Sequence, residues 1–399
     1  MKNLMLPIAL PLILASCGDE VEGRIDIDDS LPAQVTNVAY TSGPGEIYLS
    51  WDVPSSPSFM YNKVTYRNAK GEEVYRMFSK EAADANGRIT ATITGFATVD
   101  PVEFKIYACN VRYGSAEPQV ISAVPGAPAF LAVANSLQAE PAYGGVRVKY
   151  ANDTQATVYV NVDYSSKSDP SKSGSTSFVV NGNSNGSRVI VLSTGANEFI
   201  NGEDAVLKLT ARDSENNMAD PVSAESYVKK VKLIDRSGWS VPGYTDDAYG
   251  PTPGFSSQEA GGEGGVPNGR VIAMFDGNEN TFWHTAWKQS SSYPHFFVVD
   301  MGANHDVACI SVRRRTNNNG TNVGHTIYTC PASGANGDDT NAWAWEDYGW
   351  SAFNRESNDH QFYGVNSTSS RYIKMYYAMT DKGGDFVMVS EFNAYEPAE

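Results

Sequence analysis

Hydrophobic and polar residues alternate with a period of two along much of this chain. Between residues 31 and 125, short alternating stretches are separated by turns rich in glycine, proline and asparagine. Successive side chains of an extended strand point to opposite faces, so the pattern predicts strands with one buried and one exposed face. We therefore expect an antiparallel β-sandwich. Its strands include residues 35–38, 47–51, 63–66 and 102–108.

The same alternation continues between residues 126 and 236. The composition of Pro125-Gly126-Ala127-Pro128 indicates a linker between two modules. Strands are predicted at residues 145–150, 156–162 and 205–210, and the Ser/Gly/Asn-rich stretch 165–187 is predicted to be a hairpin or long loop. We expect a second sandwich, a diverged copy of the first, and we find no candidate chemistry in either module.

From residue 237 the pattern changes to long polar loops, aromatic clusters and a buried strand at 295–300. Several of its motifs resemble those of the discoidin-like family, the coagulation factor five/eight type C domains, which include many family-32 carbohydrate-binding modules. The resemblance covers roughly residues 238–396. It is carried by Ala273, Asp276-Gly277, Thr281-x-Trp283, Asp300-Met301-Gly302, the run 310–317, and the closing pair 371–374 and 387–392.

The first module resembles a fibronectin type III domain. Trp51 stands where that family has its buried tryptophan, and Phe104-x-Ile106-x-Ala108 matches a late strand. Val102 replaces the tyrosine expected two residues before Phe104, so the corner hydrogen bond of that family is not expected. The predicted fold class is all-β: two tandem Ig/fibronectin type III-like sandwiches at 31–125 and 126–236, followed by a discoidin-like jelly-roll β-sandwich at 237–399.

The N-terminus has the pattern of an export signal. Lys2 precedes an apolar core, and Leu14-Ala15-Ser16-Cys17 resembles a bacterial lipobox. This resemblance implies a signal peptide at 1–16, lipidation of Cys17 and a flexible tether at 17–30. The acidic Gly18-Asp19-Glu20 favours the outer face of the outer membrane, with periplasmic retention as the alternative. An ordinary secretory signal with a chance cysteine is the other interpretation.

The net charge limits the classes of binding partner, and the cysteine content limits the possible disulfides. The formal net charge of −16 argues against binding of nucleic acid or anionic lipid, so membrane attachment is expected through the lipid anchor only. Export permits disulfides. Cys309 and Cys330 are the natural pair, although the pairing stays open, and Cys109 is expected as a buried strand residue.

Oxygen-bearing residues crowd the turn at 276–281, as a hard cation such as calcium requires. An EF-hand is excluded because its sixth position would be Thr281 rather than glycine and its twelfth Trp287 rather than glutamate. The discoidin-like pattern implies a structural calcium site. Its predicted ligands are the side chains of Asp276, Thr281 and Glu391 and carbonyls around Ala273 and Asn278; a plain polar turn is the alternative.

Six of the seven tryptophans lie beyond residue 238. Sugars offer C–H faces that stack on aromatic rings and hydroxyls that hydrogen bond to Arg, Asn, His or acid groups. Trp283 is assigned to the core. The predicted ligand contacts are Trp287, His284, Arg315, Asn317, Trp343, Trp345 and Trp350. Strand alternation would place Arg313 and Arg315 on one face, and Trp343 and Trp345 on the same side.

Catalytic motifs are not found. The histidines lack metal-site spacing, and neither a Gly-x-Ser-x-Gly elbow nor a Walker loop occurs. Glu346 and Asp347 are the candidates for a glycosidase pair, but their separation does not follow from sequence. We predict a non-catalytic, lipid-anchored glycan-binding protein that resembles lipoproteins of Bacteroidetes glycan-uptake systems and accompanies an outer-membrane transporter. The alternative is docking of a partner protein by the discoidin-like domain.

Overall fold

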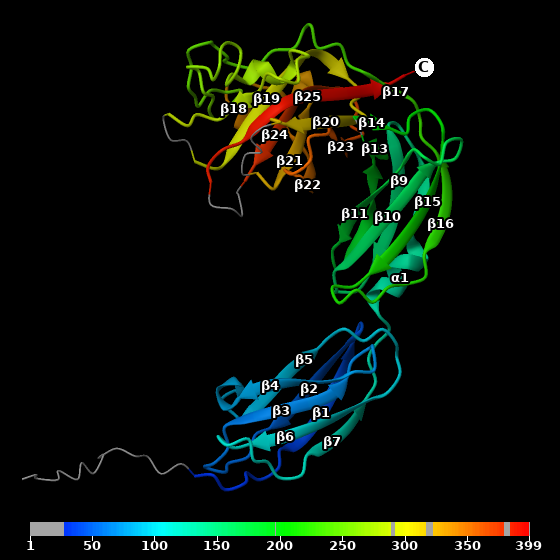
Figure 1. The fold of residues 1–399 in the computed structure, drawn as a ribbon, viewed down its shortest axis with the longest axis vertical. Helices are drawn as coiled ribbons and strands as arrows, with labels where there is room; N and C mark the ends of the chain where they lie inside the picture. The colour runs from blue at the N-terminus through cyan, green and yellow to red at the C-terminus, as the bar shows by residue number, and fades with distance from the viewer. Residues whose placement is uncertain (1–27, 196, 289–291, 317–321, 379–383, 399) are drawn as a thin grey trace, which may run out of the picture. The chain divides into compact units, whose positions relative to one another are not determined.

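The computed structural model describes residues 28–195, 197–288, 292–316, 322–378 and 384–398. The chain divides into two compact units, of which the first comprises most of residues 28–124 and the second most of the remainder. Almost every element is a β-strand, so the predicted all-β class is confirmed (Figure 1). The predictions for Cys17, for Asn317 and for the signal peptide concern residues outside the described ranges. The helices in the described ranges are too short or too polar to span a lipid bilayer.

The first unit contains two antiparallel sheets. One has the order β1-β2-β5 and the other β4-β3-β6-β7. Trp51 of β2 is fully buried between them, contacts Phe78 of β4 at 5.5 Å between ring centroids, and donates from Nε1 to Asn62 of β3. The predicted burial of Trp51 is confirmed, as is that of Cys109. The strands are β1 Thr36–Gly43, β2 Glu46–Asp52, β3 Tyr61–Arg67, β4 Glu73–Ser79, β5 Arg88–Ile93, β6 Val102–Cys109 and β7 Gln119–Ala123.

The second unit begins with another pair of sheets, ordered β12-β9-β8 and β11-β10-β15-β16, around a core of valines, leucines and alanines. The strands are β8 Gln138–Ala142, β9 Gly145–Asn152, β10 Val158–Ser166, β11 Ser173–Val180, β12 Ser184–Ile190, β15 Asp204–Arg212 and β16 Val222–Tyr227, with a small pair β13 Ser193–Gly195 and β14 Glu198–Phe199.

Two sequence predictions for this sandwich need correction. The helix α1, Ala129–Ser136, directly follows the predicted linker and buries Ala129, Phe130, Val133 and Ala134 against the core. The polar stretch 165–187 contains the whole of β11 and the start of β12. Because β11 pairs with β10 whereas β12 pairs with β9, this stretch is more than a hairpin: it carries the chain from one sheet to the other.

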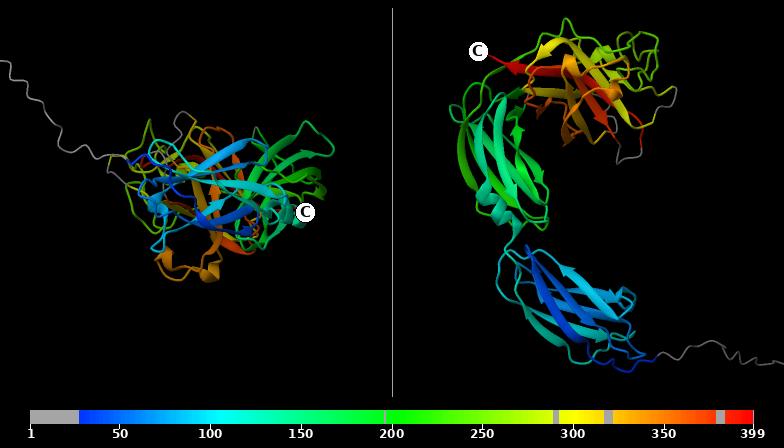
Figure 2. Two further views of the ribbon diagram at one scale, coloured as in Figure 1. Left: turned by 90° about the horizontal axis from the view of Figure 1, so that it is seen from below. Right: turned by 180° about the vertical axis from the view of Figure 1, so that it is seen from behind.

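The C-terminal sandwich packs the sheet β17-β25-β20-β23 against the sheet β19-β24-β21-β22 (Figure 2). Aromatic contacts cross between them, such as Phe297 of β19 with Phe392 of β25 at 5.3 Å. The strands are β17 Val231–Leu233, β18 Trp283–His284, β19 His295–His305, β20 Cys309–Arg314, β21 Gly324–Cys330, β22 Glu346–Ala352, β23 Gln361–Gly364, β24 Ser370–Tyr377 and β25 Met388–Pro397. Cys309 and Cys330 are both free and buried, so they do not form a disulfide.

The second and third sandwiches share packed residues. β17 lies before the predicted boundary at residue 237, yet it pairs with β25, the last strand of the chain. Val191 and Val231 pack with Ala308 and Cys309 in one apolar cluster. Phe199 adds ring contacts to Phe362 at 4.9 Å and Tyr395 at 5.5 Å. This joint is therefore held by apolar packing and strand pairing.

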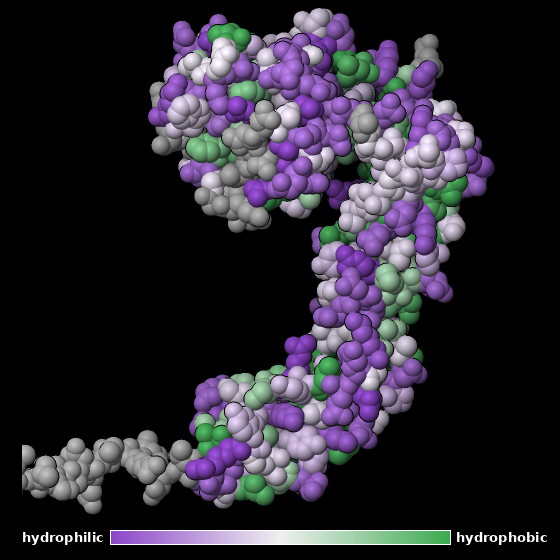
Figure 3. Space-filling view, viewed as in Figure 1, coloured by the Kyte–Doolittle hydropathy of each residue, from purple (hydrophilic) through white to green (hydrophobic). Residues whose placement is uncertain are grey.

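On the face of the C-terminal sandwich that Figure 3 shows, hydrophilic residues cover most of the surface, and hydrophobic residues are scattered among them. The long segment 241–270 belongs to the region where long polar loops are predicted, and it contains no strand. Its middle is nevertheless not exposed: Phe255, Gln258 and Glu259 are fully buried.

Candidate functional site

The site is built on the short strand β18. Trp283 is fully buried, contacts Phe297 at 5.4 Å between ring centroids, and donates from Nε1 to the carbonyl of Ser257. Its predicted core position is confirmed. Because β18 pairs with the beginning of β25, this anchor fixes where the chain leaves the core. Four residues after Trp283, Trp287 is 43% exposed.

A buried carboxylate holds the backbone beside Trp287. Glu259 is fully buried, and its Oε2 accepts from the backbone amides of Trp287 at 3.3 Å and Lys288 at 3.2 Å. The Lys288 ammonium lies 3.4 Å from Glu259 Oε1 and 5.0 Å from the centroid of the Trp287 ring. Gly269 is required here, because its φ is +88° and a β-carbon would lie 2.4 Å from the Glu259 carbonyl. Glu259 thus presents the indole to solvent on an ordered loop.

Arg315 forms the polar side of the site. Its guanidinium stacks on Phe282 at 3.9 Å from the ring centroid and pairs with Glu263 at 2.9 Å. Arg315 Nη1 and Glu263 Oε2 are buried and make no hydrogen bond within the described residues. A donor and an acceptor therefore lie buried without partners, while 21% of the Arg315 side chain and 34% of the Glu263 side chain stay exposed to a ligand.

His284 lies between these charged groups. It is 5% exposed, and its Nδ1 lies 2.6 Å from the carbonyl of Thr285. Burial lowers its pKa, Glu263 and Glu259 oppose that shift, and Arg315 adds to it. A neutral imidazole that donates from Nδ1 to a carbonyl has its lone pair on Nε2. The sequence predicts that His284 donates to a sugar hydroxyl; with Nδ1 donating to the Thr285 carbonyl, Nε2 would accept instead.

Of the predicted ligand residues, His284 and Arg315 are close enough to interact electrostatically. Trp287 is connected to them through Glu259, which holds the Trp287 amide and also acts on His284. Sequence reasoning missed Glu259, Glu263 and the ring of Phe386, which lies 5.4 Å from His284. The two carboxylates belong to the Gly-rich segment before the Ala273 motif, where acids among glycines were a visible signal. The predicted contact Asn317 falls outside the described residues.

Trp343 and Trp345 belong to a different cluster. Their rings stack at 5.7 Å and 26°, as the same-side prediction implied. Both indole N–H groups donate to backbone carbonyls, of Gly337 and Thr340 respectively. Trp343 contacts Tyr372 at 4.5 Å, and the Lys374 ammonium lies 5.7 Å from the Trp345 ring. These contacts place the pair on the outer face of β24, half-buried.

Trp350 and Arg313 also have surroundings of their own. Trp350 of β22 is 56% exposed and covers Gly324, where a β-carbon would lie 2.3 Å from the ring. A register shift between Arg313 and Arg314 interrupts the predicted alternation. Arg313 turns to Glu279 at 3.4 Å, whereas Arg315 turns to Glu263. Both Arg313 and Arg314 are buried, so this end of β20 is not a solvated strand edge.

The predicted calcium ligands converge on the Thr281 hydroxyl. Thr281 Oγ1 lies 2.7 Å from the Asn278 carbonyl, 2.8 and 2.9 Å from the two Asp276 oxygens, and 3.3 Å from the Ala273 carbonyl. A hydroxyl has one hydrogen and donates to one of these oxygens at a time. The turn is possible because Gly277 takes a φ of +85°.

Glu391 completes this oxygen cluster. It is 2% exposed; Oε2 accepts from Arg236 at 2.5 Å, and Oε1 is buried without a hydrogen bond in the described part of the chain. Burial raises the pKa of Glu391, and the nearby Asp276 raises it further against the pull of Arg236. Among the described residues, no three or more His, Cys, Asp or Glu side chains are arranged so that they alone could hold a metal ion. The set consists of two carboxylates, two carbonyls and a hydroxyl, which are the ligands calcium prefers.

The two packed sheets, the anchored tryptophan and the loop cluster define the C-terminal region as a discoidin-like all-β domain. Residues 255–392 match the family model of the F5/8 type C domain, within the range of the resemblance found in the sequence. The C-terminal region therefore carries an F5/8 type C domain.

Individual relatives are more distant. A sialidase of Micromonospora viridifaciens is 37% identical over 65 residues, which are 16% of this chain and 10% of the sialidase. The C-terminal domain of a Bacteroides fragilis chitobiase is similar at 22% identity and a TM-score of 0.34, over 42% of this chain and 100% of that one. A family 32 carbohydrate-binding module from C. perfringens, solved with galactose, is similar at 21% identity and a TM-score of 0.31, over 42% of this chain and 99% of that one. A SusE-like protein is similar at 14% identity and a TM-score of 0.34, over 68% of this chain and 99% of that one.

Proposed function

We propose that the C-terminal domain binds a carbohydrate through the site formed by Trp287, His284, Arg315 and Glu263. The observations that carry this proposal are the exposed Trp287 indole on the chain segment held by Glu259, and the partly exposed ion pair of Arg315 with Glu263, four residues after Glu259. The indole offers a flat face to the C–H groups of a pyranose. The guanidinium donates to a sugar hydroxyl, and the Glu263 carboxylate and His284 Nε2 accept from neighbouring hydroxyls.

We infer that binding takes place without cleavage. A glycosidase requires one carboxyl that carries a proton and a second carboxylate at a defined separation. The carboxylates found at this site have other partners: Glu263 faces Arg315 at 2.9 Å, and Glu259 faces Lys288 at 3.4 Å. Glu259 also holds two backbone amides. These contacts favour a positioning and hydrogen-bonding role for both residues.

We also propose that Asp276, Thr281 and Glu391, with the carbonyls of Ala273 and Asn278, hold a structural calcium ion. The ion would supply positive charge to oxygens that otherwise face one another, and it would tie the 276–281 turn to β25. Asp276 would contribute carboxylate oxygens, and the unpaired Oε1 of Glu391 would contribute a third. No chemical step at the glycan site depends on it.

The remaining proposal concerns where binding happens. We propose that Cys17 is lipidated and holds the protein at the outer membrane, facing the cell exterior, where it captures polysaccharide for a glycan transporter. The support is the lipobox-like Leu14-Ala15-Ser16-Cys17 and the acidic segment after it. A tethered binding domain raises the local concentration of a polymer near the membrane, so a weak site suffices.

Affinity electrophoresis of residues 18–399 in gels that contain a panel of neutral polysaccharides tests the binding proposal. We expect at least one polymer to retard the protein and Trp287→Ala to weaken that retardation by about tenfold, through loss of the stacking surface. Trp350→Ala removes an indole that is as exposed but lies elsewhere, and it should migrate as wild type. Release of sugar during incubation with the same panel would contradict the non-catalytic part, and equal retardation of both variants would contradict the site.

A further inference from the structure

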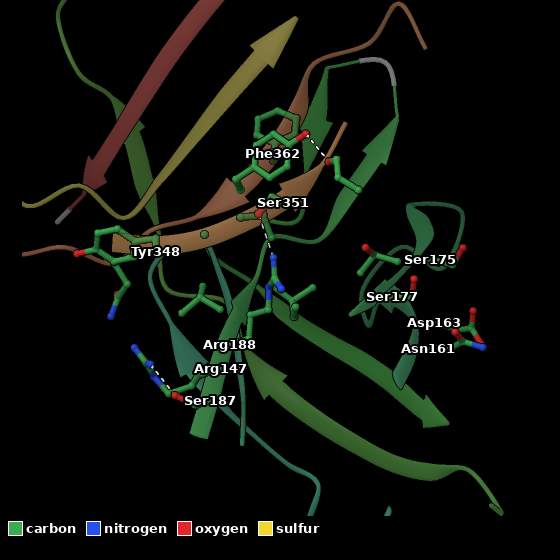
Figure 4. A pocket seen from close by; sticks show the side chains of 18 of the residues that line it. Arg147, Asn161, Asp163, Ser175, Ser177, Ser187, Arg188, Tyr348, Ser351 and Phe362 are labelled. Carbon is green, nitrogen blue, oxygen red and sulfur yellow. Dashed lines mark hydrogen bonds between the residues drawn. The ribbon is translucent and has the colours of Figure 1, made fainter. Parts of the chain in front are cut away.

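A recess lies at the joint between the second and third sandwiches. It has a volume of about 1120 Å³. β9, β10, β11 and β12 contribute one wall and β22 and β23 the other (Figure 4). The apolar cluster around Val191 and Cys309 and the pairing of β17 with β25 hold the two walls together. The recess is therefore built into this unit, and it is formed by residues other than those of the Trp287 site.

Two arginines in this recess have no acidic partner. Arg147 donates to Ser187 at 3.1 Å, and Arg188 donates across the joint to Ser351 at 3.0 Å (Figure 4). Neither forms an ion pair within the described residues, although acidic residues outnumber basic ones in the chain, 46 to 30. Burial lowers the pKa of Arg188, which reflects a cation removed from water without a counter-charge. Both guanidinium groups keep donors for an anion.

The rest of the lining suits a polyhydroxylated chain. Tyr348 and Phe362 contribute aromatic side chains to the lining (Figure 4), and Lys208 adds a cation opposite Asp163 of the neighbouring strand. Opposite them lies a row of side chains that donate or accept hydrogen bonds, namely Asn161, Ser175, Thr176 and Ser177. The lining also contains the carboxylates Asp163 and Glu346, which accept only and favour a ligand with few acid groups. Such a lining combines a ring face, anion-binding donors and many hydroxyl partners, whereas a purely anionic partner would use only the arginines.

We propose that this joint recess binds an acidic sugar of a glycan chain, with its carboxylate or sulfate on Arg147 and Arg188. The proposal rests on the proposed function for the general class of ligand, but it uses a separate set of residues. The net charge of −16 opposes densely charged polymers. A glycan whose acid groups are separated by neutral, hydroxylated sugars is therefore the better fit.

Affinity electrophoresis separates the two sites. The probes are chondroitin, whose uronates alternate with neutral sugars, chondroitin sulfate for the sulfate arm, and a neutral polymer that the wild type binds. Arg147→Ala should weaken retardation by the acidic polymers about tenfold, as loss of a hydrogen bond to a charged group implies. Arg188→Lys keeps the cation but not the forked donors, so it should weaken retardation less. The better of the two acidic polymers identifies carboxylate or sulfate as the bound group.

Lys149→Ala is the matched control. Lys149 lies two residues from Arg147 on the same strand, is paired with Glu140, and is not part of the recess. It should leave acidic retardation unchanged. Trp287→Ala should weaken neutral retardation about tenfold, as above, yet retain acidic retardation. The recess proposal is overturned if Arg147→Ala equals Lys149→Ala, if no acidic polymer retards the wild type, or if Trp287→Ala removes acidic retardation too. Loss of the Trp287 effect on the neutral polymer would instead overturn the proposed function alone.

Discussion

His284 shows how burial determines the role of one side chain. Its Nδ1 faces a backbone carbonyl, and its low exposure lowers the pKa below the usual 6.5. At neutral pH the ring is therefore uncharged, with Nε2 as an acceptor. Protonation would turn that acceptor into a donor and add a charge beside Arg315, so it should weaken the binding of a sugar hydroxyl.

Glycan affinity should therefore depend on pH with a definite sign. We expect it to be constant from pH 8 to about 6.5 and to fall several-fold at lower pH, once His284 takes up a proton below its ordinary pKa. Titration calorimetry at each pH measures this. His284→Gln supplies an acceptor that does not titrate, and its affinity should be flat over the same range. A profile that is identical for both proteins, or that rises in acid, would refute the assigned tautomer.

Single-residue predictions succeeded where one side chain determines its own environment. Trp51, Trp283 and Cys109 were expected to be buried because large apolar residues within alternating strands have few other solutions, and all three are. Glu259 was not foreseen. A carboxylate among glycines ordinarily indicates an exposed loop, and only the return of residues 287–288 toward this loop makes its burial favourable.

At the scale of elements, the turn at 276–281 and the strand β25 share one set of oxygens. A bound ion stabilises only the folded arrangement, by an amount that grows with its free concentration. At a hundredfold excess over Kd, calcium should add about 2.7 kcal/mol to the free energy of unfolding. The apparent Tm after chelation should rise by several degrees when calcium is restored.

Calorimetry of wild type and Asp276→Asn with chelator, calcium or magnesium measures this effect. The variant keeps the size of the side chain and removes its charge, so calcium should no longer shift its Tm. Magnesium demands a tighter octahedral site and should act weakly on the wild type. An unchanged wild-type Tm across all three conditions would contradict the calcium proposal.

The strand β21 carries a buried imidazole of a different kind. His325 is fully buried, both ring nitrogens lack hydrogen bonds within the described residues, and it contacts the rings of Phe353, Tyr363 and Tyr377. Burial lowers its pKa from 6.5 to about 3. The unfolded chain therefore binds a proton that the folded domain does not. Stability is fully present above pH 6.5 and is lost as the pH falls from there toward 3.

Replacing His325 should reduce this acid sensitivity. His325→Phe fills an aromatic environment and removes one titrating group, so the loss of unfolding free energy should be smaller by up to about 1.4 kcal/mol per pH unit between pH 6 and 4. Chemical denaturation at each pH gives the slope. The N-terminal unit contains no histidine and provides an internal reference. Equal slopes for the two proteins would show that His325 titrates normally in the fold.

Elements were predictable where polarity alternates strongly. β2, β6, β19 and β24 lie close to their expected positions because their apolar positions leave one register. α1 was missed because Gly126 and Pro128 favour a linker at its start, although Phe130 and Ala134 have helical spacing. β11 was missed because its serines face outward and only Phe178 and Val180 are buried.

For the whole molecule, the proposed capture of polysaccharide at the cell surface requires attachment of the N-terminus to the membrane. If Cys17 is lipidated, cells that express the full chain and are labelled with a palmitate analogue should yield a labelled, membrane-bound protein. Cys17→Ser should be unlabelled and released from the membrane fraction. Protease accessibility in intact cells then distinguishes an exterior from a periplasmic location. Labelling that persists in Cys17→Ser would contradict the assignment.

The all-β class and the discoidin-like C-terminal region were accessible from alternation and motifs, but the site was not fully so. The predicted ligand residues have separate surroundings in the structure: Trp287, His284 and Arg315 around Glu259 and Glu263, Trp343 and Trp345 in another cluster, and Trp350 over Gly324. Which loops of a sandwich meet depends on contacts between distant segments. Neither period nor spacing encodes those contacts.

Hydrogen–deuterium exchange with and without a retarding glycan tests the central claim most directly, because it locates the bound sugar without a substitution. We predict slower exchange of backbone amides at residues 259–263, 282–288 and 313–316 when the glycan is present. Residues 340–350, around the other tryptophans, should exchange as in the free protein. Protection confined to residues 340–350, or no protection in the C-terminal domain at a saturating glycan concentration, would contradict the account.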